Sequence, residues 1–527
     1  MSATRTLAPS HPQPARTHAR RIARARRHVL AAVRWAAPPA LALAAAVAHA
    51  GVAQGPMVQA VTNKQAGVWV RTSVDQAVRI RYTDPLGNSL TTDPVTTSLL
   101  ASDDTASFLL TGLAPATKYT YQVGTTDPDS GIESWTGNYA FETVGGVVKS
   151  MHIAVLSDFR NNLKGSDALQ KALNWKPDLL AVIGDLDHRD PARDKHGKPR
   201  PPEDAPIVLN DLRKMHRDSR DPARPLGQNF FSGIVGEQDS GKLQIPWVYA
   251  WDDHDYCANN EDQTCTFRSE AVQAWDEYYI AAPDNAFSAG CSGDFESLTY
   301  GKLVQVFFLD ARSQSDATAP DGPTAMLGAC QHAWLVDGLH ASKATWKIVM
   351  SPVPMNATTK TYDAWGFYPN ERASLLAAIA DVPNVVIVSG DIHSGGAIDE
   401  GEHSGRPEAS TPHADMPDTW VNTYCRNEDH TTLLSRPGSW TIGSNLDPII
   451  DIKPMQCLAQ FFPDDYPVDR EIAPVYPLDG RGNPGYVWIG VTPTEFNLTV
   501  RDVNGNVKQG VRADGSAAAL KLNLVAP

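Results

Sequence analysis

The chain has 527 residues, and at roughly 150 residues per domain this length predicts two or three folded domains. Hydrophobic residues make up 42% and charged residues 20%, with 13 Trp, which excludes a disordered or collagen-like chain. The formal net charge is −14, although residues 1–50 hold 8 Arg and no acidic residue. Without these Arg, 38 basic residues face 60 acidic ones, a formal charge of −22. So acidic a body repels nucleic-acid phosphates, and we expect no binding to duplex DNA or RNA.

The N-terminal segment has the composition of an export signal. An Arg-rich stretch precedes apolar residues from Trp35 to Val47, and Ala48-His49-Ala50 has the small-x-small form of a cleavage site. We therefore predict a signal peptide over residues 1–50, in which Arg26-Arg27 resembles a twin-arginine motif, and an exported protein, periplasmic or extracellular. The alternative is a disordered basic arm. No later segment offers 18 uninterrupted apolar residues, so no transmembrane segment is predicted in the mature chain.

Six cysteines form an even set, which in an exported chain permits disulfides. Cys257 and Cys265 lie close enough in sequence to close a local loop. No CxxC pair or zinc-type spacing is present, so none of the six is assigned to a metal or a nucleophilic role. The set is Cys257, Cys265, Cys291, Cys330, Cys425 and Cys457.

Residues 57–145 alternate between short strands and turn signals, which predicts a β-sandwich. The expected strands are 67–71, 77–82, 106–110 and 119–123, separated by turns such as Asp84-Pro85-Leu86-Gly87. The segment from Leu113 to Tyr121 resembles the corner of fibronectin type III-like domains. Nothing in this region indicates catalysis.

After residue 150 the pattern changes to continuous apolar runs, typical of strands buried on both faces, with helices between them. This predicts an α/β fold with helices near 166–173 and 372–379 and irregular segments over 189–224 and 400–480. Strand character returns near the C-terminus, with Asn504-Gly505 as a turn. The runs are 153–156, 179–183, 245–251, 303–309, 348–350 and 385–388, followed by 486–491 and 495–502.

Acidic residues follow several of these runs directly. Ser157-Asp158, Gly184-Asp185, Asp252-Asp253-His254-Asp255 and Gly390-Asp391-Ile392-His393 each come at a strand end. In open α/β sheets the carboxyl ends of the strands form the ligand-binding crevice, so we expect these groups to converge there. Carboxylates so close together repel one another unless cations neutralise them. The pattern therefore predicts a metal centre.

Four carboxylates and two imidazoles are enough to hold two ions, with Asp185 shared between them. We expect an all-oxygen half, made by Asp185, Asp253 and Asp391, to suit Ca, Mg or Mn. The half that contains His188 and His393 suits Fe, Zn or Mn. The predicted metal-ligating set is Asp158, Asp185, His188, Asp253, Asp391 and His393.

The ordered motifs resemble the PhoD-like alkaline phosphatases of the calcineurin-like metallophosphoesterase superfamily. Beside the strand-end motifs, this resemblance rests on Leu309-Asp310-Ala311-Arg312, Gln331 with Trp334-Leu335, Trp365-Gly366-Phe367-Tyr368 and Glu371-Arg372. It implies a four-layer αββα sandwich over residues 150–527, preceded by the fibronectin III-like β-sandwich. It also implies a role for each site residue: Asp158 and His393 bind the first metal, Asp185 bridges, and Asp253 and Asp391 bind the second. His254 steadies the transition state and protonates the leaving oxygen.

The chain departs from the superfamily pattern at three positions. His188 takes the place of a Tyr, Arg160 stands where a ligand His is common, and Ser351 stands at another metal-binding His position. Arg160 cannot bind a metal, and contact with a phosphate oxygen and a salt bridge are equally good interpretations. An extra ligand for the second metal would have to come from elsewhere, such as Asn422 or Asn445. We interpret Asp252, Asp255, Asp310 and Arg312 as supporting groups.

The resulting hypothesis is an exported two-metal phosphoesterase that hydrolyses phosphomonoesters or phosphodiesters through a metal-bound hydroxide, without a covalent intermediate. Phospholipase D or nucleotidase activity at the same site is the enzymatic alternative. An inactive surface-binding protein is the alternative from another class.

Overall fold

Three β-sheets organise the part of the chain that the computed structural model describes, which comprises residues 51–160, 166–280, 291, 293–357, 363–393, 395–414, 472–474, 484–512 and 517–526. The predicted signal peptide, Cys425, Cys457, Asn422, Asn445 and most of residues 415–483 lie outside these ranges. Within them no helix has both the length and the apolar composition needed to cross a membrane.

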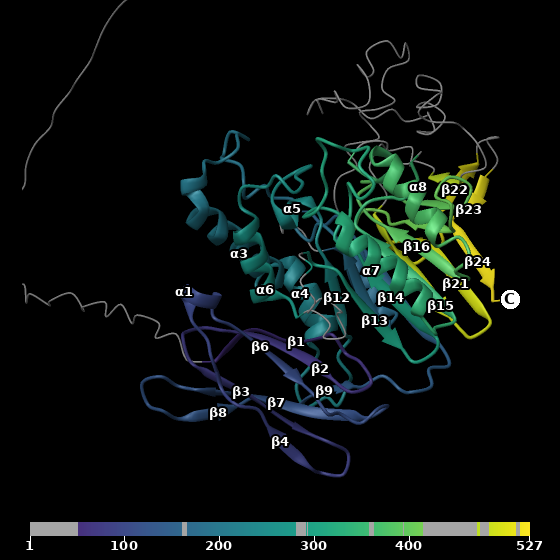
Figure 1. The fold of residues 1–527 in the computed structure, drawn as a ribbon. Helices are drawn as coiled ribbons and strands as arrows, with labels where there is room; N and C mark the ends of the chain where they lie inside the picture. The colour runs from purple at the N-terminus through teal and green to yellow at the C-terminus, as the bar shows by residue number, and fades with distance from the viewer. Residues whose placement is uncertain are drawn as a thin grey trace, which may run out of the picture. The chain divides into compact units, whose positions relative to one another are not determined.

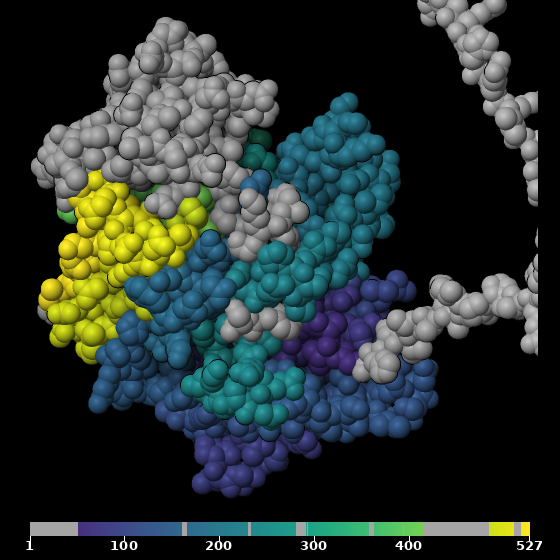
Figure 2. All heavy atoms as spheres, turned by 180° about the vertical axis from the view of Figure 1, so that it is seen from behind, coloured from purple at the N-terminus to yellow at the C-terminus, as the bar shows by residue number. Residues whose placement is uncertain are grey.

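The first sheet holds the strands that lead into the predicted site. Its centre is the parallel set β10, β11 and β12, in the register Ala154 to Leu180 and Leu180 to Trp247. The C-terminal strand β20 runs antiparallel to β10. On the surface, yellow atoms from near the C-terminus lie next to blue atoms of the segment after the N-terminal strands (Figure 2). The strands in order are β24 (Lys521–Val525), β21 (Glu495–Asp502), β20 (Gly485–Val491), β10 (Met151–Leu156), β11 (Leu179–Ile183), β12 (Trp247–Ala250), β1 (Val52–Gln59), β2 (Ala66–Thr72) and β6 (Thr105–Leu110).

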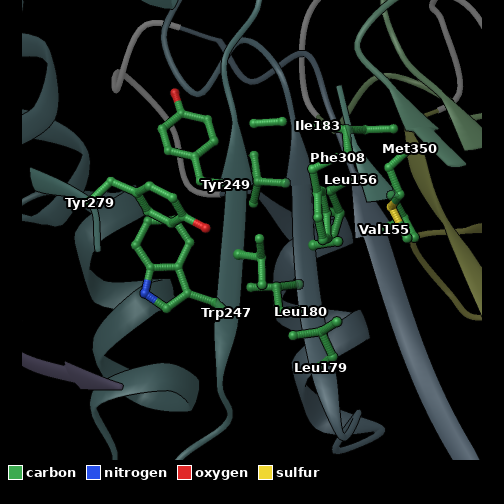
Figure 3. Close-up of a cluster of buried hydrophobic side chains, with 14 of the residues drawn as sticks. Val155, Leu156, Leu179, Leu180, Ile183, Trp247, Tyr249, Tyr279, Phe308 and Met350 are labelled. Carbon is green, nitrogen blue, oxygen red and sulfur yellow. The ribbon is translucent and has the colours of Figure 1, made fainter. Parts of the chain in front are cut away.

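The second sheet packs face to face with the first. Along β15, Ile348 and Met350 join the core shared with the first sheet, whereas Val349 faces a separate core on the other side. Figure 3 shows Phe308 and Met350 next to Leu156 of the first sheet. The order is β13 (Glu296–Tyr300), β14 (Val304–Phe308), β15 (Trp346–Ser351), β16 (Val385–Ser389), β18 (Glu408–Ser410), β17 (Ala397–Asp399), β19 (Ile472–Pro474), β22 (Gln509–Arg512) and β23 (Ala517–Ala519).

Helices cover the outer faces of this pair of sheets (Figure 1). On the second sheet, Leu335 and Leu339 of α7 (Gly328–Ala341) and Leu375 of α8 (Pro369–Ala378) share the outer core with Val349. On the first sheet, α2 (Asp167–Asn174) packs against β10 and β20. The predicted αββα sandwich is therefore confirmed. The other helices are α1 (Leu99–Ser102), α3 (Ala205–Arg220), α4 (Pro225–Phe230), α5 (Asp253–Tyr256), α6 (Arg268–Tyr278) and the short turns η1 (Pro202–Asp204), η2 (Phe231–Val235) and η4 (Trp365–Phe367).

The predicted N-terminal β-sandwich is present, and one of its two sheets is continuous with the first catalytic sheet. Strands β1, β2 and β6 form that half, and β1 pairs with β12 in parallel at Gln59 and Trp247. The Tyr119 hydroxyl accepts the Ala114 N–H at 2.9 Å, the hydrogen bond of a tyrosine corner. Domain boundaries at 57, 145 and 150 stay predictions. The opposing sheet contains β4 (Ser89–Thr91), β3 (Ala77–Thr83), β7 (Lys118–Thr126) and β8 (Glu133–Trp135), with β5 (Val95–Thr96) and β9 (Tyr139–Glu142) alongside.

The prediction that residues 189–224 are irregular throughout was wrong, because α3 occupies half of that segment. Val208, Leu212 and Met215 recur at helical spacing and are buried. Charged residues lie between these apolar positions, and their partners are far away in sequence. Arg213, for example, donates to Glu277 of α6 at 2.7 Å. The apolar periodicity was therefore not recognised as that of a helix.

The predicted local pair Cys257–Cys265 is confirmed as a disulfide. A second disulfide joins Cys291 to Cys330, just inside α7.

Replacement of Gln244 by Met should destabilise the junction between the β-sandwich and the catalytic sheets. The buried Gln244 amide accepts from the Tyr121 hydroxyl at 2.6 Å and donates to the carbonyls of Pro56 and Val235 at 2.9 and 2.7 Å. A thioether cannot satisfy these groups, so we expect a loss of about 2 to 4 kcal/mol in the free energy of unfolding. Urea denaturation measures this loss. The exposed Gln228→Met is the matched control, and a similar effect in both variants would contradict the assigned role.

Candidate metal centre

The predicted acidic residues meet where the two catalytic sheets come together. Asp158, Asp185 and Asp253 follow β10, β11 and β12, and Asp391 follows β16 of the second sheet. The close approach depends on glycine at two points. A Cβ on Gly390 would lie 2.8 Å from the carbonyl oxygens of Ile183 and Pro352, and one on Gly184 would lie 2.6 Å from the Asp252 Cβ.

Four of the predicted ligands have left-handed backbone conformations. The φ angles are 59° at Asp158, 53° at Asp185, 53° at Asp391 and 44° at His393. Non-glycine residues occupy this region at a cost of order 1 kcal/mol or more, and they persist in it where neighbouring contacts fix the chain. Their concentration here marks a locally constrained functional site.

One buried cluster contains Asp158, Asp185, His188 and His393, whose candidate ligand atoms all lie within 4.8 Å of one another. The His188 Nε2 lies 3.1 Å from Asp185 Oδ2 and 3.1 Å from the His393 Nε2. The His393 Nε2 lies 3.0 Å from Asp158 Oδ1. Two carboxylates and two imidazoles at these separations make a donor set suited to Fe, Zn or Mn.

A second buried cluster contains Asp185, Asp253 and His254, so Asp185 belongs to both clusters. Its buried Oδ1 has no hydrogen-bond partner among the described residues, which is costly for a carboxylate unless a cation compensates it. Asp391 belongs to neither cluster. It lies 3.8 Å from His393 and 3.1 Å from the Arg312 guanidinium. The residues present therefore fit a metal centre with one shared carboxylate.

Neighbouring groups fix the orientation of the candidate ligands. The His188 Nδ1 lies 2.7 Å from the Phe159 carbonyl, so Nδ1 holds the proton and Nε2 faces the cluster. The Ser157 hydroxyl donates to Asp158 Oδ2 at 2.5 Å and is itself 2.5 Å from the Thr411 hydroxyl. Thr411 was not predicted from the sequence, because only the fold places it behind Asp158.

The loop that carries Asp185 is held by Asp255, one of the groups interpreted as supporting. Asp255 accepts the N–H of Asp185 at 2.6 Å and that of Leu186 at 3.2 Å, and it bonds the Tyr249 hydroxyl. It also forms a capping box with Asp252 at the start of α5, the helix that contains Asp253 and His254. One carboxylate thus couples the ends of β11 and β12.

His254 has an acidic partner that the sequence did not reveal. Its Nδ1 lies 3.0 Å from Asp190 Oδ1 and 3.3 Å from the Arg189 carbonyl. The ring centroids of His254 and His188 are 4.6 Å apart. Asp190 lies five residues after Asp185, and that spacing was the one sequence signal for it.

The carboxylates and imidazoles of the centre shift one another's pKa values. Burial raises the pKa of Asp158, but His393, hydrogen bonds and His188 outweigh burial and lower it to about 2. Burial lowers the pKa of His188, but Asp185 outweighs it and raises this pKa to about 9. The pKa of His254 is raised well above its ordinary value, because Asp253, Asp185 and Asp190 outweigh burial.

Ser351 and Arg160, two of the positions that depart from the superfamily pattern, have different surroundings. The buried Ser351 hydroxyl donates to the Val353 carbonyl at 2.6 Å and accepts from the Trp365 indole at 3.1 Å, so its bonds are internal to the fold. Arg160 is half-buried, two residues after Asp158.

Gln331 fixes the turn before Arg312. Its side-chain amide accepts the Asp310 N–H at 2.9 Å and donates to the Asp310 carbonyl at 2.8 Å.

Comparison with known proteins agrees with this fold and site. Residues 238–415 match the PhoD-like phosphatase family, and residues 49–130 match a domain of unknown function, DUF7800. A structure of PhoD aligns with 88% of this chain and 91% of its own length, at 18% identity and a TM-score of 0.61. Purple acid phosphatase PPD1 from yellow lupin (Lupinus luteus) seeds aligns with 89% of this chain and 74% of its own, at 13% identity and a TM-score of 0.52. The comparison with curated proteins gives no match.

The match of residues 238–415 to the PhoD-like phosphatases, together with buried Asp/His clusters that could hold metal, indicates a hydrolase of the metal-dependent phosphoesterase class. The two structural matches support the same fold. Within this class the resemblance to the PhoD-like phosphatases, predicted from the ordered motifs, is confirmed.

Replacement of Ser157 by Ala should weaken metal binding to the cluster that contains Asp158. The hydroxyl is the donor that orients Asp158 Oδ2, and loss of such a partner typically costs about 10- to 100-fold in metal affinity. Competition with a chelator, read as metal content per chain, measures this change. Ser351→Ala is the control, because its hydroxyl bonds to Val353 and Trp365, and equal metal loss in both variants would contradict the assignment.

Proposed function

We propose that this protein is an exported phosphoesterase that uses two metal ions to hydrolyse phosphomonoesters, phosphodiesters or both. The observation that carries the proposal is the membership of Asp185 in two buried clusters. A shared carboxylate is the arrangement that holds two ions a few ångströms apart in two-metal hydrolases.

We propose the two ligand sets that the sequence predicts, in which Asp391 is assigned to the second set by the family resemblance and not by either buried cluster. Asp158, Asp185, His188 and His393 would hold Fe, Zn or Mn, and Asp185, Asp253 and Asp391 would hold Ca, Mg or Mn. When bound, the ions supply Lewis acidity toward the phosphoryl oxygens and toward a water molecule. Arg160 is proposed as a contact for a phosphate oxygen, because a guanidinium matches that group by two hydrogen bonds.

We assign His254 the role of the catalytic acid. Asp190 lies 3.0 Å from its Nδ1 and so orients the ring and favours the imidazolium. An imidazolium beside the phosphoryl group offsets negative charge in the transition state and gives a proton to the leaving oxygen. Within the described part of the chain, the Ser157 hydroxyl bonds to Asp158 and to the Thr411 hydroxyl and not to a histidine, which supports direct hydrolysis without a covalent intermediate.

Export is supported by the sequence of residues 1–50 and by the two disulfides. Structural disulfides persist in oxidising compartments and are rare in the reducing cytosol. The periplasm and the extracellular space both meet this condition.

Phospholipase D or nucleotidase activity would use the same residues and differ only in the substrate. Product analysis on a phospholipid, a nucleotide and a bis-aryl phosphate separates these substrates. Hydrolysis of none of the three would contradict the proposed function.

Replacement of Asp185 by Asn should remove both bound metal and activity. The variant loses the charge that both clusters share, so we expect aryl phosphate turnover to fall by at least about a thousandfold. Metal analysis of the purified protein should show depletion in the same sample. Asp178→Asn is the control, because Asp178 lies at the opposite end of β11 and accepts the His152 N–H. Retained metal and turnover in Asp185→Asn would refute the shared-ligand role.

Replacement of Asp190 by Asn should shift the pH profile rather than abolish turnover. Asp190 helps to raise the pKa of His254, and the acid form is the one that donates the proton. Removal of the carboxylate lowers this pKa, so the alkaline limb of the kcat profile should move to lower pH. Asp194→Asn, in the neighbouring turn, is the control. An unmoved alkaline limb with lower kcat at every pH would assign Asp190 a purely structural role.

A further inference from the structure

Arg312 is a buried guanidinium surrounded by four carboxylates. Its side chain is 3% exposed, and it reaches the site from the turn after β14. Nε bonds Asp252 and Nη1 bonds Asp363. Nη2 lies 3.1 Å from Asp391 Oδ2 and 3.6 Å from Asp253 Oδ2. Every nitrogen of the guanidinium thus faces an acidic group.

These contacts join the two sheets of the catalytic sandwich. Asp252 and Asp253 follow β12 of the first sheet, whereas Arg312 and Asp391 follow β14 and β16 of the second. The turn that presents Arg312 is fixed by Asp310, which accepts the Arg312 and Ser313 N–H groups at 3.0 and 2.9 Å. A guanidinium does not lose its proton in proteins, so the positive charge at this point is permanent.

The two halves of the centre therefore meet different electrostatic surroundings. Within the described part of the chain, Asp253 and Asp391 each form an ion pair with Arg312, whereas the ion pairs of Asp158 and Asp185 are with histidines. Histidine gives up its proton to a metal ion, but Arg312 cannot. A divalent ion between Asp253 and Asp391 has to share both carboxylates with a fixed like charge, which weakens its binding.

We propose that Arg312 is a built-in cation of the second half of the centre and makes the two halves unequal in metal affinity. The Asp158, Asp185, His188 and His393 set retains its ion. The Asp253 and Asp391 pair binds a hard divalent cation weakly and exchangeably. This inference rests on the proposed two-metal function and assigns Arg312 as a positioning residue.

Calorimetric titration with CaCl₂ alone tests the inference, on full-length protein dialysed against metal-free buffer and analysed for retained metal. Wild type should retain about one ion per chain and bind Ca²⁺ weakly. Arg312→Gln removes the competing charge and should bind Ca²⁺ at least about tenfold more tightly. Arg312→Lys keeps the charge and should stay within about threefold of wild type.

Asp363→Asn should change the Ca²⁺ affinity in the opposite direction from Arg312→Gln. Asp363 bonds Arg312 but belongs to neither cluster, so its loss leaves the arginine charge less compensated. Ca²⁺ binding should therefore weaken by about threefold or more. A purely structural cross-link predicts weaker binding in both Arg312→Gln and Asp363→Asn. That result, or two ions retained equally by wild type, would overturn the inference.

The outcomes separate the inference from the function on which it rests. Wild type that retains no ion and does not hydrolyse an aryl phosphate contradicts the proposed function. Wild type that retains an ion and is active, with Ca²⁺ responses of the wrong sign in the variants, contradicts the role of Arg312 alone. Thermal unfolding checks the fold of each variant. Should Arg312→Gln fail to fold, the wild-type stoichiometry decides the question, because two ions retained equally would overturn the inference.

Discussion

Mutual repulsion among buried carboxylates is the constraint on which the rest of the site depends. Five carboxylates of the site are buried, and carboxylates so placed cannot all ionise without nearby positive charge. They belong to Asp158, Asp185, Asp252, Asp253 and Asp391. The chain meets part of this need itself, through Arg312 and through histidines whose pKa values are raised. The remaining negative charge is what metal ions would neutralise. With cations in place, such a site would be close to neutral and could accept a phosphate anion, as the proposed function requires.

The general fold and the main site residues could be predicted from the sequence because strand ends are local signals. A buried apolar run followed by Asp marks its own position at the edge of a sheet, and four such runs gave Asp158, Asp185, Asp253 and Asp391. The contacts that could not be predicted from the sequence are those between residues far apart in the chain. Arg312 meets Asp252 across 60 residues and Asp391 across 79, and Thr411 meets Ser157 across 254. No periodicity encodes such contacts.

Long-range contacts also explain why α3 was not predicted and why the pairing of the β-sandwich with the catalytic sheet was not predicted. The apolar face of α3 is interrupted by arginines whose partners belong to distant elements, such as Asp103 for Arg217. The alternating strands of the N-terminal region were correctly predicted as a sandwich, yet nothing in them indicates that β1 pairs with β12. That pairing is one register position at Gln59 and Trp247, and it appears only when the whole sheet is assembled.

This junction gives the sandwich a part in positioning the centre. β1 pairs with β12 at Trp247, the first residue of β12. After the other end of β12, Asp252 caps α5, which contains Asp253 and His254. Trp247 also packs against Tyr279 and the Arg220 guanidinium, so the start of the strand is held by α3 and by the segment after α6. Because the strand is short and its first residue is held in place, its last residue has little room to move. There Asp255 accepts the N–H of Asp185 and so connects the strand to the Asp185 loop. The sandwich thereby limits the movement of one half of the centre relative to the other, which is the precision that a shared carboxylate requires.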